Sequence, residues 1–277
     1  MKNKISIFIT TLLLVSCWDS KTNTQQQTGE TGDSLVHAEK IVFTNSNFNK
    51  KSKIFDSELP NYNINIDVRC AEGKSKAAQR INQQLATFLF GNTIMPFDEA
   101  KQHFADSLAK EYEKELREFY DPDNEYQGTF AYEYSQTGKV SADAPAGIVA
   151  YTNRIEMYTG GAHGGAMESY INFQEETGRI ITCEELFGYK QDEVKKLIKE
   201  QIIKDNECKT EAELTEKRSI FSLGDVYITD NNFLIEKDGI LFCYNPYDIA
   251  PWSEGFIYAK LSYKKLEGLI TPNLIKN

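Results

Sequence analysis

The stretch GIVAYTNRIEMYTGGAHGGAMESYINFQ, residues 147–174, decides the fold class. Its two ends, 147–158 and 168–174, are rich in Tyr, Val, Ile and Phe and predict antiparallel β-strands. Between them, four glycines surround Ala162 and His163 in residues 160–165. Because glycine adopts positive φ without steric cost, this segment predicts a tight corner between two strands.

Upstream of this stretch, the pattern predicts three further strands and two helices. Alternating apolar residues at 62–68 and a short apolar run at 41–43 indicate strands, and 129–135 indicates another. Apolar residues recur at helical spacing from residue 74, and Gly91 suits a left-handed helix end. A second apolar stripe predicts a helix over 96–119, with acidic residues in its first turn.

Downstream, the chain returns to strands after one helical region. Residues 180–183 are predicted to be extended, an amphipathic helix is expected from Leu186 through Ile202, and 205–217 is a polar stretch. Strands follow at 233–235, 240–244 and 256–261, with a short helix near Leu266. Helices and hairpins are segregated along the chain, so the fold class is α+β, with a mostly antiparallel sheet and packed helices. We expect two sub-domains, 40–157 and 158–277.

The first 39 residues resemble a secretory signal peptide followed by a linker. Lys2 and Lys4 precede an apolar run that is too short to span a bilayer, as in a secretory leader over 1–16. The residues Leu14-Val15-Ser16-Cys17 resemble the lipobox of bacterial lipoproteins, so Cys17 is the expected lipidation site and membrane anchor. Residues 17–39 contain few large apolar side chains and are expected to form a flexible tether.

Composition limits the partners and the chemistry. The 277 residues carry a formal net charge of −10, which disfavours nucleic-acid binding because such binding needs clustered Lys and Arg. Nucleotide-binding glycine loops, zinc-peptidase HExxH motifs and GxSxG elbows are absent from the sequence. We therefore expect no cofactor, no metal and no assigned catalytic residue. The pairs Glu175-Glu176 and Glu184-Glu185 are better explained as solvated charges than as a hydrolase pair.

Four cysteines remain besides Cys17, at positions 70, 183, 208 and 243. Four cysteines allow three pairings, and none of their spacings is a CxxC motif. Both disulfides and free buried thiols therefore remain open at this point.

Two segments are candidate contact surfaces. The corner at 160–165 could present backbone amides or His163 to a ligand, although a purely structural corner is the simpler alternative. The loop from Tyr244 to Trp252 holds two prolines and several aromatic residues, and a stiff aromatic loop loses little entropy on binding sugar or protein. Packing of this loop onto the sheet would explain it equally well. The candidate binding residues are Tyr158, Gly160, Gly161, His163, Gly164, Tyr244, Tyr247, Asp248 and Trp252.

Several spaced motifs carry a family resemblance. They are Tyr158 to Gly164, Asn172 with Thr177-Gly178-Arg179, Leu186-Phe187, Phe233 to Gly239, and Tyr247 to Pro251 with Gly255. Together they resemble the extracytoplasmic domain of unknown function, type 3298, that occurs in the lysozyme-sensing anti-sigma-V factor and in peptidoglycan deacetylase C. The resemblance covers about 160–269, and the region in front resembles the smaller 4163-type partner domain.

The resemblance implies an envelope module that binds a partner. We expect a lipid-anchored, extracytoplasmic protein of the bacterial cell envelope, periplasmic or on the surface, that recognises a lysozyme-like muramidase or peptidoglycan. The chain lacks the residues of an appended deacetylase, so catalysis is not implied. The alternative is an envelope hydrolase that acts on peptidoglycan through His163 and a nearby carboxylate.

Overall fold

A computed structural model describes residues 40–55, 58–220 and 223–275. The expected leader at 1–16, the lipidation site Cys17 and the tether at 17–39 lie outside these residues. Within the described ranges, no helix is both long enough and apolar enough to cross a bilayer.

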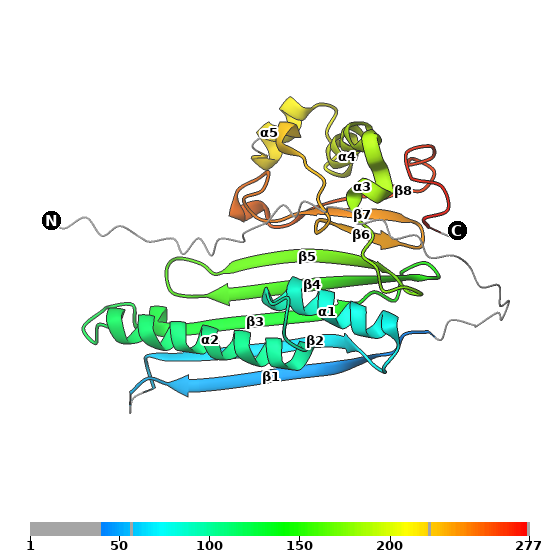
Figure 1. Ribbon diagram of the computed structural model, residues 1–277. Coiled ribbons are helices and arrows are strands. Elements are labelled where there is room, and N and C mark those ends of the chain that lie inside the picture. The colour runs from blue at the N-terminus through cyan, green and yellow to red at the C-terminus, as the bar shows by residue number, and fades with distance from the viewer. Residues whose placement is uncertain (1–39, 56–57, 221–222, 276–277) are drawn as a thin grey trace. The chain divides into compact units, whose positions relative to one another are not determined.

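The first half of the fold is a five-stranded sheet with the order β1-β2-β3-β4-β5 (Figure 1). Its strands are β1 (Phe43–Lys53), β2 (Asn61–Ala71), β3 (Ala131–Val140), β4 (Ile148–Tyr158) and β5 (Gly165–Gln174). Neighbours pair in antiparallel fashion except β2 and β3, which are parallel. The mostly antiparallel α+β class predicted from the sequence is confirmed, with one parallel pair that the sequence did not indicate.

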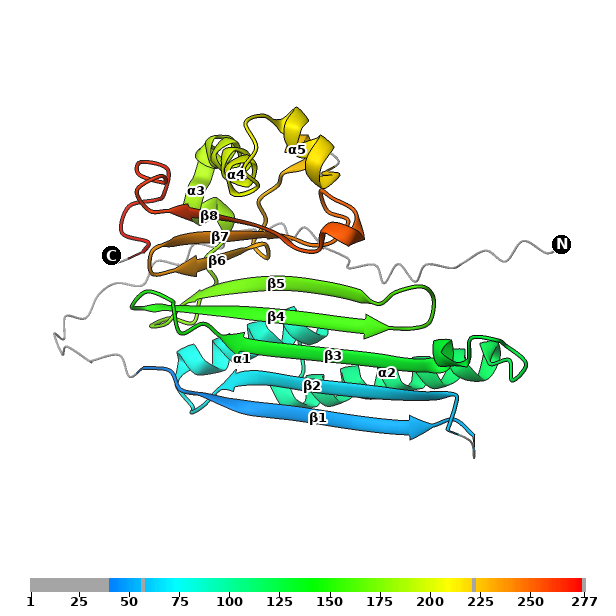
Figure 2. The ribbon, with the colours of Figure 1, turned by 180° about the vertical axis from the view of Figure 1, so that it is seen from behind.

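Two helices connect β2 to β3 and cover one face of this sheet, as Figures 1 and 2 show from opposite sides. They are α1 (Lys76–Phe90) and α2 (Phe97–Phe119). The Ser75 side chain accepts a hydrogen bond from the Ala78 N–H to start α1, and Gly91, at φ 67°, ends it. Alternate residues of β2, among them Ile64, Ile66 and Val68, are fully buried under these helices. Both helices were predicted from their apolar stripes.

The other face of β1 and β2 carries polar side chains and no helix (Figure 2). Its residues, in register across the two strands, include Asn45, Asn47, Asn49, Asn61, Asn63 and Asn65. Of the eleven residues of β1, only Ser46 is buried, so the strand lacks the alternation of apolar and polar residues that sequence patterns detect. This explains why only 41–43 was expected to be extended.

The second half contains a three-stranded antiparallel sheet with the order β6-β7-β8. Its strands are β6 (Phe233–Glu236), β7 (Gly239–Tyr244) and β8 (Ile257–Ser262). The helices α3 (Cys183–Phe187), α4 (Gln191–Asp205) and α5 (Glu211–Arg218) accompany it. Short 3-10 turns occupy η1 (Gln127–Phe130), η2 (Gly188–Lys190), η3 (Leu223–Asp225) and η4 (Trp252–Glu254).

Two sequence expectations for this half differ from the structure. The polar stretch 205–217 contains α5, whose N-terminus is capped by the Thr210 side chain. Leu214 is the single buried residue of α5, so the helix has no apolar stripe in the sequence. The chain near Leu266 forms consecutive turns in place of the expected helix, and Leu266 itself is buried in the second core.

The two sheets are joined along β5. The side-chain amide of Asn172, which is fully buried, donates to the Phe233 carbonyl and accepts from the Ile235 N–H, both at 2.9 Å. The Tyr170 N–H also donates to the Asn231 carbonyl at 2.9 Å. Because β5 is still part of the five-stranded sheet, that sheet continues beyond the expected division between residues 157 and 158.

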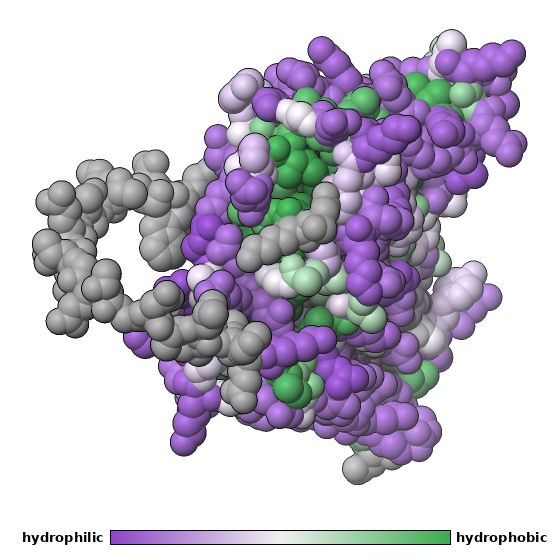
Figure 3. Space-filling view, turned by 90° about the vertical axis from the view of Figure 1, so that its right-hand side faces the viewer, coloured by the Kyte–Doolittle hydropathy of each residue, from purple (hydrophilic) through white to green (hydrophobic). Residues whose placement is uncertain are grey.

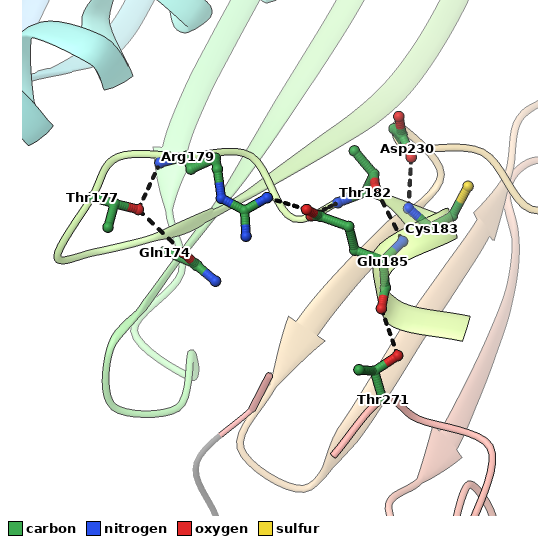
Figure 4. A network of polar contacts seen from close by, with 8 residues as sticks. All are labelled: Gln174, Thr177, Arg179, Thr182, Cys183, Glu185, Asp230 and Thr271. Atoms are coloured by element: carbon green, nitrogen blue, oxygen red, sulfur yellow. Dashed lines mark hydrogen bonds and ion pairs between the residues drawn. The ribbon is translucent and has the colours of Figure 1, made fainter. Parts of the chain in front are cut away.

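A polar network fixes the start of α3 after β5 (Figure 4). Thr182 and Glu185 form a capping box, and Glu185 also pairs with Arg179. The Cys183 N–H donates to Asp230 at 2.6 Å, and the Thr271 hydroxyl donates to the Glu185 carbonyl at 2.6 Å. Glu185 is therefore a structural residue of the second half and not merely a solvated charge.

The cysteines of the described residues, Cys70, Cys183, Cys208 and Cys243, are all free thiols. Burial is the main cause that raises the pKa of both Cys183 and Cys243 to about 12. These thiols are therefore protonated near neutral pH and act as packing groups.

Candidate functional site

The two candidate surfaces predicted from the sequence meet in the structure. The corner between β4 and β5 and the loop between β7 and β8 lie at the same end of the molecule, the left-hand end in Figure 1. The His163 ring stacks on the Trp252 ring with centroids 4.8 Å apart and planes 9° apart. The stack joins a loop of the five-stranded sheet to a loop of the three-stranded sheet, across 89 residues of sequence.

Tyr247 completes this aromatic cluster, which we define as His163, Tyr247 and Trp252. The Tyr247 and Trp252 rings are stacked at 6.4 Å and 29°, and the Tyr247 hydroxyl lies 3.4 Å from His163 Nε2. His163 Nδ1 lies 2.8 Å from the Gly164 carbonyl. Since a carbonyl only accepts, Nδ1 carries a hydrogen and donates it to Gly164.

The corner has its shape because its glycines tolerate conformations and contacts that other residues do not. Gly160 and Gly161 have φ of 85° and 90°. A Cβ on Gly164 would lie 2.7 Å from the Met157 carbonyl oxygen. The Tyr158 hydroxyl closes the corner by donating to the Gly161 carbonyl at 3.0 Å. The predicted positive φ and close backbone approach are both present.

The carboxylate of Asp248 holds the loop between β7 and β8 by hydrogen bonds. This carboxylate accepts from the Asn245 N–H at 2.7 Å and from the Tyr227 hydroxyl at 2.5 Å. Tyr244 is fully buried, and its hydroxyl donates to the Tyr227 carbonyl at 2.9 Å. Of the candidate residues in this loop, Tyr247 and Trp252 therefore form the cluster, whereas Tyr244 and Asp248 support it.

Asn245 connects this loop to β5. Its side-chain oxygen accepts from the Glu168 N–H at 2.6 Å. The Glu168 carboxylate accepts from the hydroxyls of Tyr170 at 3.0 Å and Tyr258 at 2.6 Å, and it lies 3.7 Å from Arg154. Burial, followed by the hydrogen bond to Glu168, raises the pKa of Tyr258 above its usual value. The hydrogen bonds of Glu168 thus link β5 of the first sheet to β8 of the second, beside the cluster.

A hollow opens on the other side of the corner. It is lined by Tyr126, Gly128, Thr129, Tyr158, Gly161 and Ala162. Tyr126 belongs to the connection between α2 and β3, and it is 69% exposed. Sequence reasoning missed Tyr126, Gly128 and Thr129, because a single tyrosine in a polar connection carries no periodic pattern that would mark it.

The residues of the hydrolase alternative are not assembled around His163. Neither of its ring nitrogens contacts a carboxylate in the described part of the chain. Glu175 directly follows β5, at the end of that strand opposite the corner, and its carboxylate accepts from the Ile41 N–H at 3.1 Å. Figure 3 faces the right-hand side of Figure 1, where β5 ends. Hydrophilic residues dominate the surface there, and hydrophobic residues gather mainly in the upper half of the view. Across the described residues, no three His, Cys, Asp or Glu side chains form a group that could hold a metal ion.

Comparison with known families gives each half of the fold a counterpart. Residues 46–166 match the family described as deacetylase PdaC, and residues 184–264 match the protein of unknown function DUF3298. The chain combines a PdaC-type domain with a DUF3298 domain. The family resemblance expected from the spaced motifs is confirmed. The corner with His163 falls in the PdaC-type match and Trp252 in the DUF3298 match, so the aromatic cluster forms where the two domains meet.

Solved structures share this fold. A DUF3298 family protein from Bacteroides fragilis superposes with a TM-score of 0.74 at 23% identity, over 84% of this chain and 94% of that one. A DUF3298 family protein from Pseudomonas aeruginosa gives a TM-score of 0.59 at 18% identity, over 87% of this chain and 99% of that one. At these identities, the likeness establishes the fold alone. No curated protein matches the chain.

Proposed function

We propose that this protein is an envelope-associated binding module that recognises the glycan of peptidoglycan through the aromatic cluster. The observation that carries the proposal is the stack of His163 on Trp252, which joins two loops from two domains into one aromatic surface. Aromatic rings pair their apolar faces with the C–H faces of sugars and keep a polar edge for hydroxyl groups.

The cluster is organised before any ligand arrives. Tyr247 is 59% exposed, yet its ring, hydroxyl and backbone N–H all have partners within the cluster and its loop. Asp248 and the glycines of the corner fix the backbone on both sides. Because little side-chain freedom remains to be lost, binding costs less conformational entropy than binding by a mobile loop.

Charge near the cluster favours an uncharged sugar over a cationic protein. The nearby carboxylates already have internal partners: Glu254 binds Arg218 at 2.8 Å, and Glu168 lies near Arg154. The third, Asp248, accepts from Asn245 and Tyr227. These three carboxylates are therefore less available to attract a cationic, lysozyme-like protein. Recognition of such a protein is therefore the alternative outcome of the test.

The expected anchor is consistent with this function. A leader over 1–16, lipidation at Cys17 and a tether over 17–39 would hold the folded part outside the cytoplasm and near the membrane. A tether of this length extends on the order of a few tens of Å. The module could then reach cell-wall glycan from a fixed membrane position.

Calorimetry with the full-length chain tests the proposal. We expect soluble peptidoglycan fragments to bind, and Trp252→Ala to weaken binding at least about fivefold, since an aromatic contact contributes about 1–3 kcal/mol. The control is Tyr189→Ala, which removes an aromatic ring that is 89% exposed in another part of the fold. A binding signal with lysozyme and none with the peptidoglycan fragments would show that the partner is a protein and not the glycan. Equal binding by Trp252→Ala and the parent chain would place recognition elsewhere.

A further inference from the structure

The open hollow beside the corner is a second feature of this end of the molecule that is lined by aromatic rings. Two tyrosines, Tyr126 and Tyr158, line it together with Thr129, Ala162 and the backbone of Gly128 and Gly161. Its lining contains no charged side chain. A ligand that fits it must offer an apolar face, and any hydrogen bonds must be made with backbone groups or hydroxyls.

Hydrogen bonds hold the backbone of the outer wall of the hollow. The Tyr126 N–H donates to the Asn124 side chain at 2.7 Å, and the Tyr126 carbonyl accepts from the Thr129 hydroxyl at 2.8 Å. The Gln127 side chain donates to three carbonyls of the preceding turn, among them that of Asn124 at 2.7 Å. The backbone of Tyr126 is thus held by hydrogen bonds, and its ring is exposed to solvent.

The hollow and the aromatic cluster share the corner. Gly161 and Ala162 line the hollow, and the next residue, His163, stacks on Trp252. Tyr158 lines the hollow and donates to the Gly161 carbonyl, so the hollow and the cluster both include residues of the segment 158–163. The hollow and the aromatic cluster therefore lie only a few residues apart along the chain.

We propose that the hollow is a second sugar subsite, and that the ligand is a glycan chain of several N-acetylated sugars that spans both sites. This inference rests on the proposed function and specifies its ligand. One sugar stacks on the aromatic cluster, and a sugar further along the same chain places its apolar face and acetamido methyl group between Tyr126 and Tyr158. Once the first site is occupied, the second contact is intramolecular, so affinity rises with chain length without a second independent binding event.

The test is a chain-length series measured by calorimetry with the full-length protein. The probes are purified oligosaccharides of two, four and six sugars from peptidoglycan. We expect the six-sugar fragment to bind at least about tenfold more tightly than the two-sugar fragment. Tyr126→Ala should bring the ratio of these two dissociation constants close to one. Tyr126→Phe keeps the ring and should keep the ratio, and the matched control Tyr189→Ala should not change it.

Each outcome separates this inference from the proposed function. If the parent chain binds two and six sugars equally, or if Tyr126→Ala keeps the full ratio, the second subsite is wrong while recognition at the cluster stands. If no fragment binds at any length, the proposed function itself fails. The melting curve of each variant shows whether it is folded, and should Tyr126→Ala unfold, Tyr126→Leu, which also removes the ring but keeps an apolar side chain, takes its place.

Discussion

Tyr247 keeps a backbone conformation that is unfavourable for any residue with a side chain. Its φ is 75°, in the left-handed region, which costs about 1–2 kcal/mol for a non-glycine residue. The conformation persists because the Tyr247 N–H donates to the Ala250 carbonyl at 2.9 Å and because Asp248 fixes the turn. In return, an exposed ring is held beside His163 and Trp252. Such strain is typical of sites where a side chain must be positioned.

A different residue, Asp98, ties the stability of the first half to pH. Its carboxylate accepts from the Ser46 hydroxyl at 2.6 Å and lies 3.0 Å from Nζ of Lys101, whose side chain is 9% exposed. The hydrogen bond from Ser46, and then Lys101, lower the pKa of Asp98 below its usual value. The ionised form is therefore favoured in the fold, and its contribution to stability is present above about pH 4 and is lost as the pH falls.

We predict that Asp98→Asn lowers the free energy of unfolding at pH 7 by about 0.5–1 kcal/mol, because Lys101 loses its carboxylate but the Asp98 side chain is 75% exposed, so water screens the pair. The difference from the parent chain should shrink as the pH falls below 4, because Asp98 takes up a proton first in the unfolded chain and, at lower pH, in the fold as well. Urea denaturation at pH 7 and pH 3 measures this. A difference of the same size at both pH values would contradict the pKa argument.

Among the elements, those with a strong pattern were predictable and those formed by polar residues were not. The apolar stripes predicted α1 and α2, and the flanking aromatic runs predicted β4 and β5. The parallel pairing of β2 with β3 arises because two consecutive helices carry the chain across the sheet, and no residue of either strand indicates this. Edge strand β1 and helix α5 each bury a single residue, so neither has a periodic pattern.

The turn after β5 requires glycine at position 178. This turn packs against α1, where the side chain of Gln84, in the middle of the helix, donates to the Gly178 carbonyl at 2.9 Å. Gly178 has φ 66°, and a Cβ there would overlap the Ala77 carbonyl. The turn thus fixes α1 against the strand that also joins the two sheets.

We predict that Gly178→Ala destabilises the protein more than Gly268→Ala does. Gly268 has a similar φ of 76°, but a Cβ there would meet nothing within 4 Å, so it reports the backbone cost alone. The overlap with Ala77 should add about 1–3 kcal/mol to that cost. Chemical denaturation of the two variants measures the difference. Equal losses would mean that α1 moves freely away from the turn.

At the scale of the whole molecule, the candidate site depends on the placement of two domains. The sequence identified both loops of the cluster, because glycine-rich and proline-aromatic runs are unusual in composition. It did not indicate that His163 meets Trp252, since that contact depends on how β5 joins the three-stranded sheet through Asn172. It also gave no indication of Tyr126, which gains a role only from the position of its loop beside the corner.

The fluorescence of Trp252 tests the central claim most directly. The chain has two tryptophans, Trp18 and Trp252, so a full-length Trp18→Phe variant makes Trp252 the single emitter. If peptidoglycan glycan stacks on the cluster, titration with a six-sugar fragment should change the emission in a saturable way, with the midpoint that calorimetry gives. Saturable binding by calorimetry with an unchanged Trp252 emission would contradict the account.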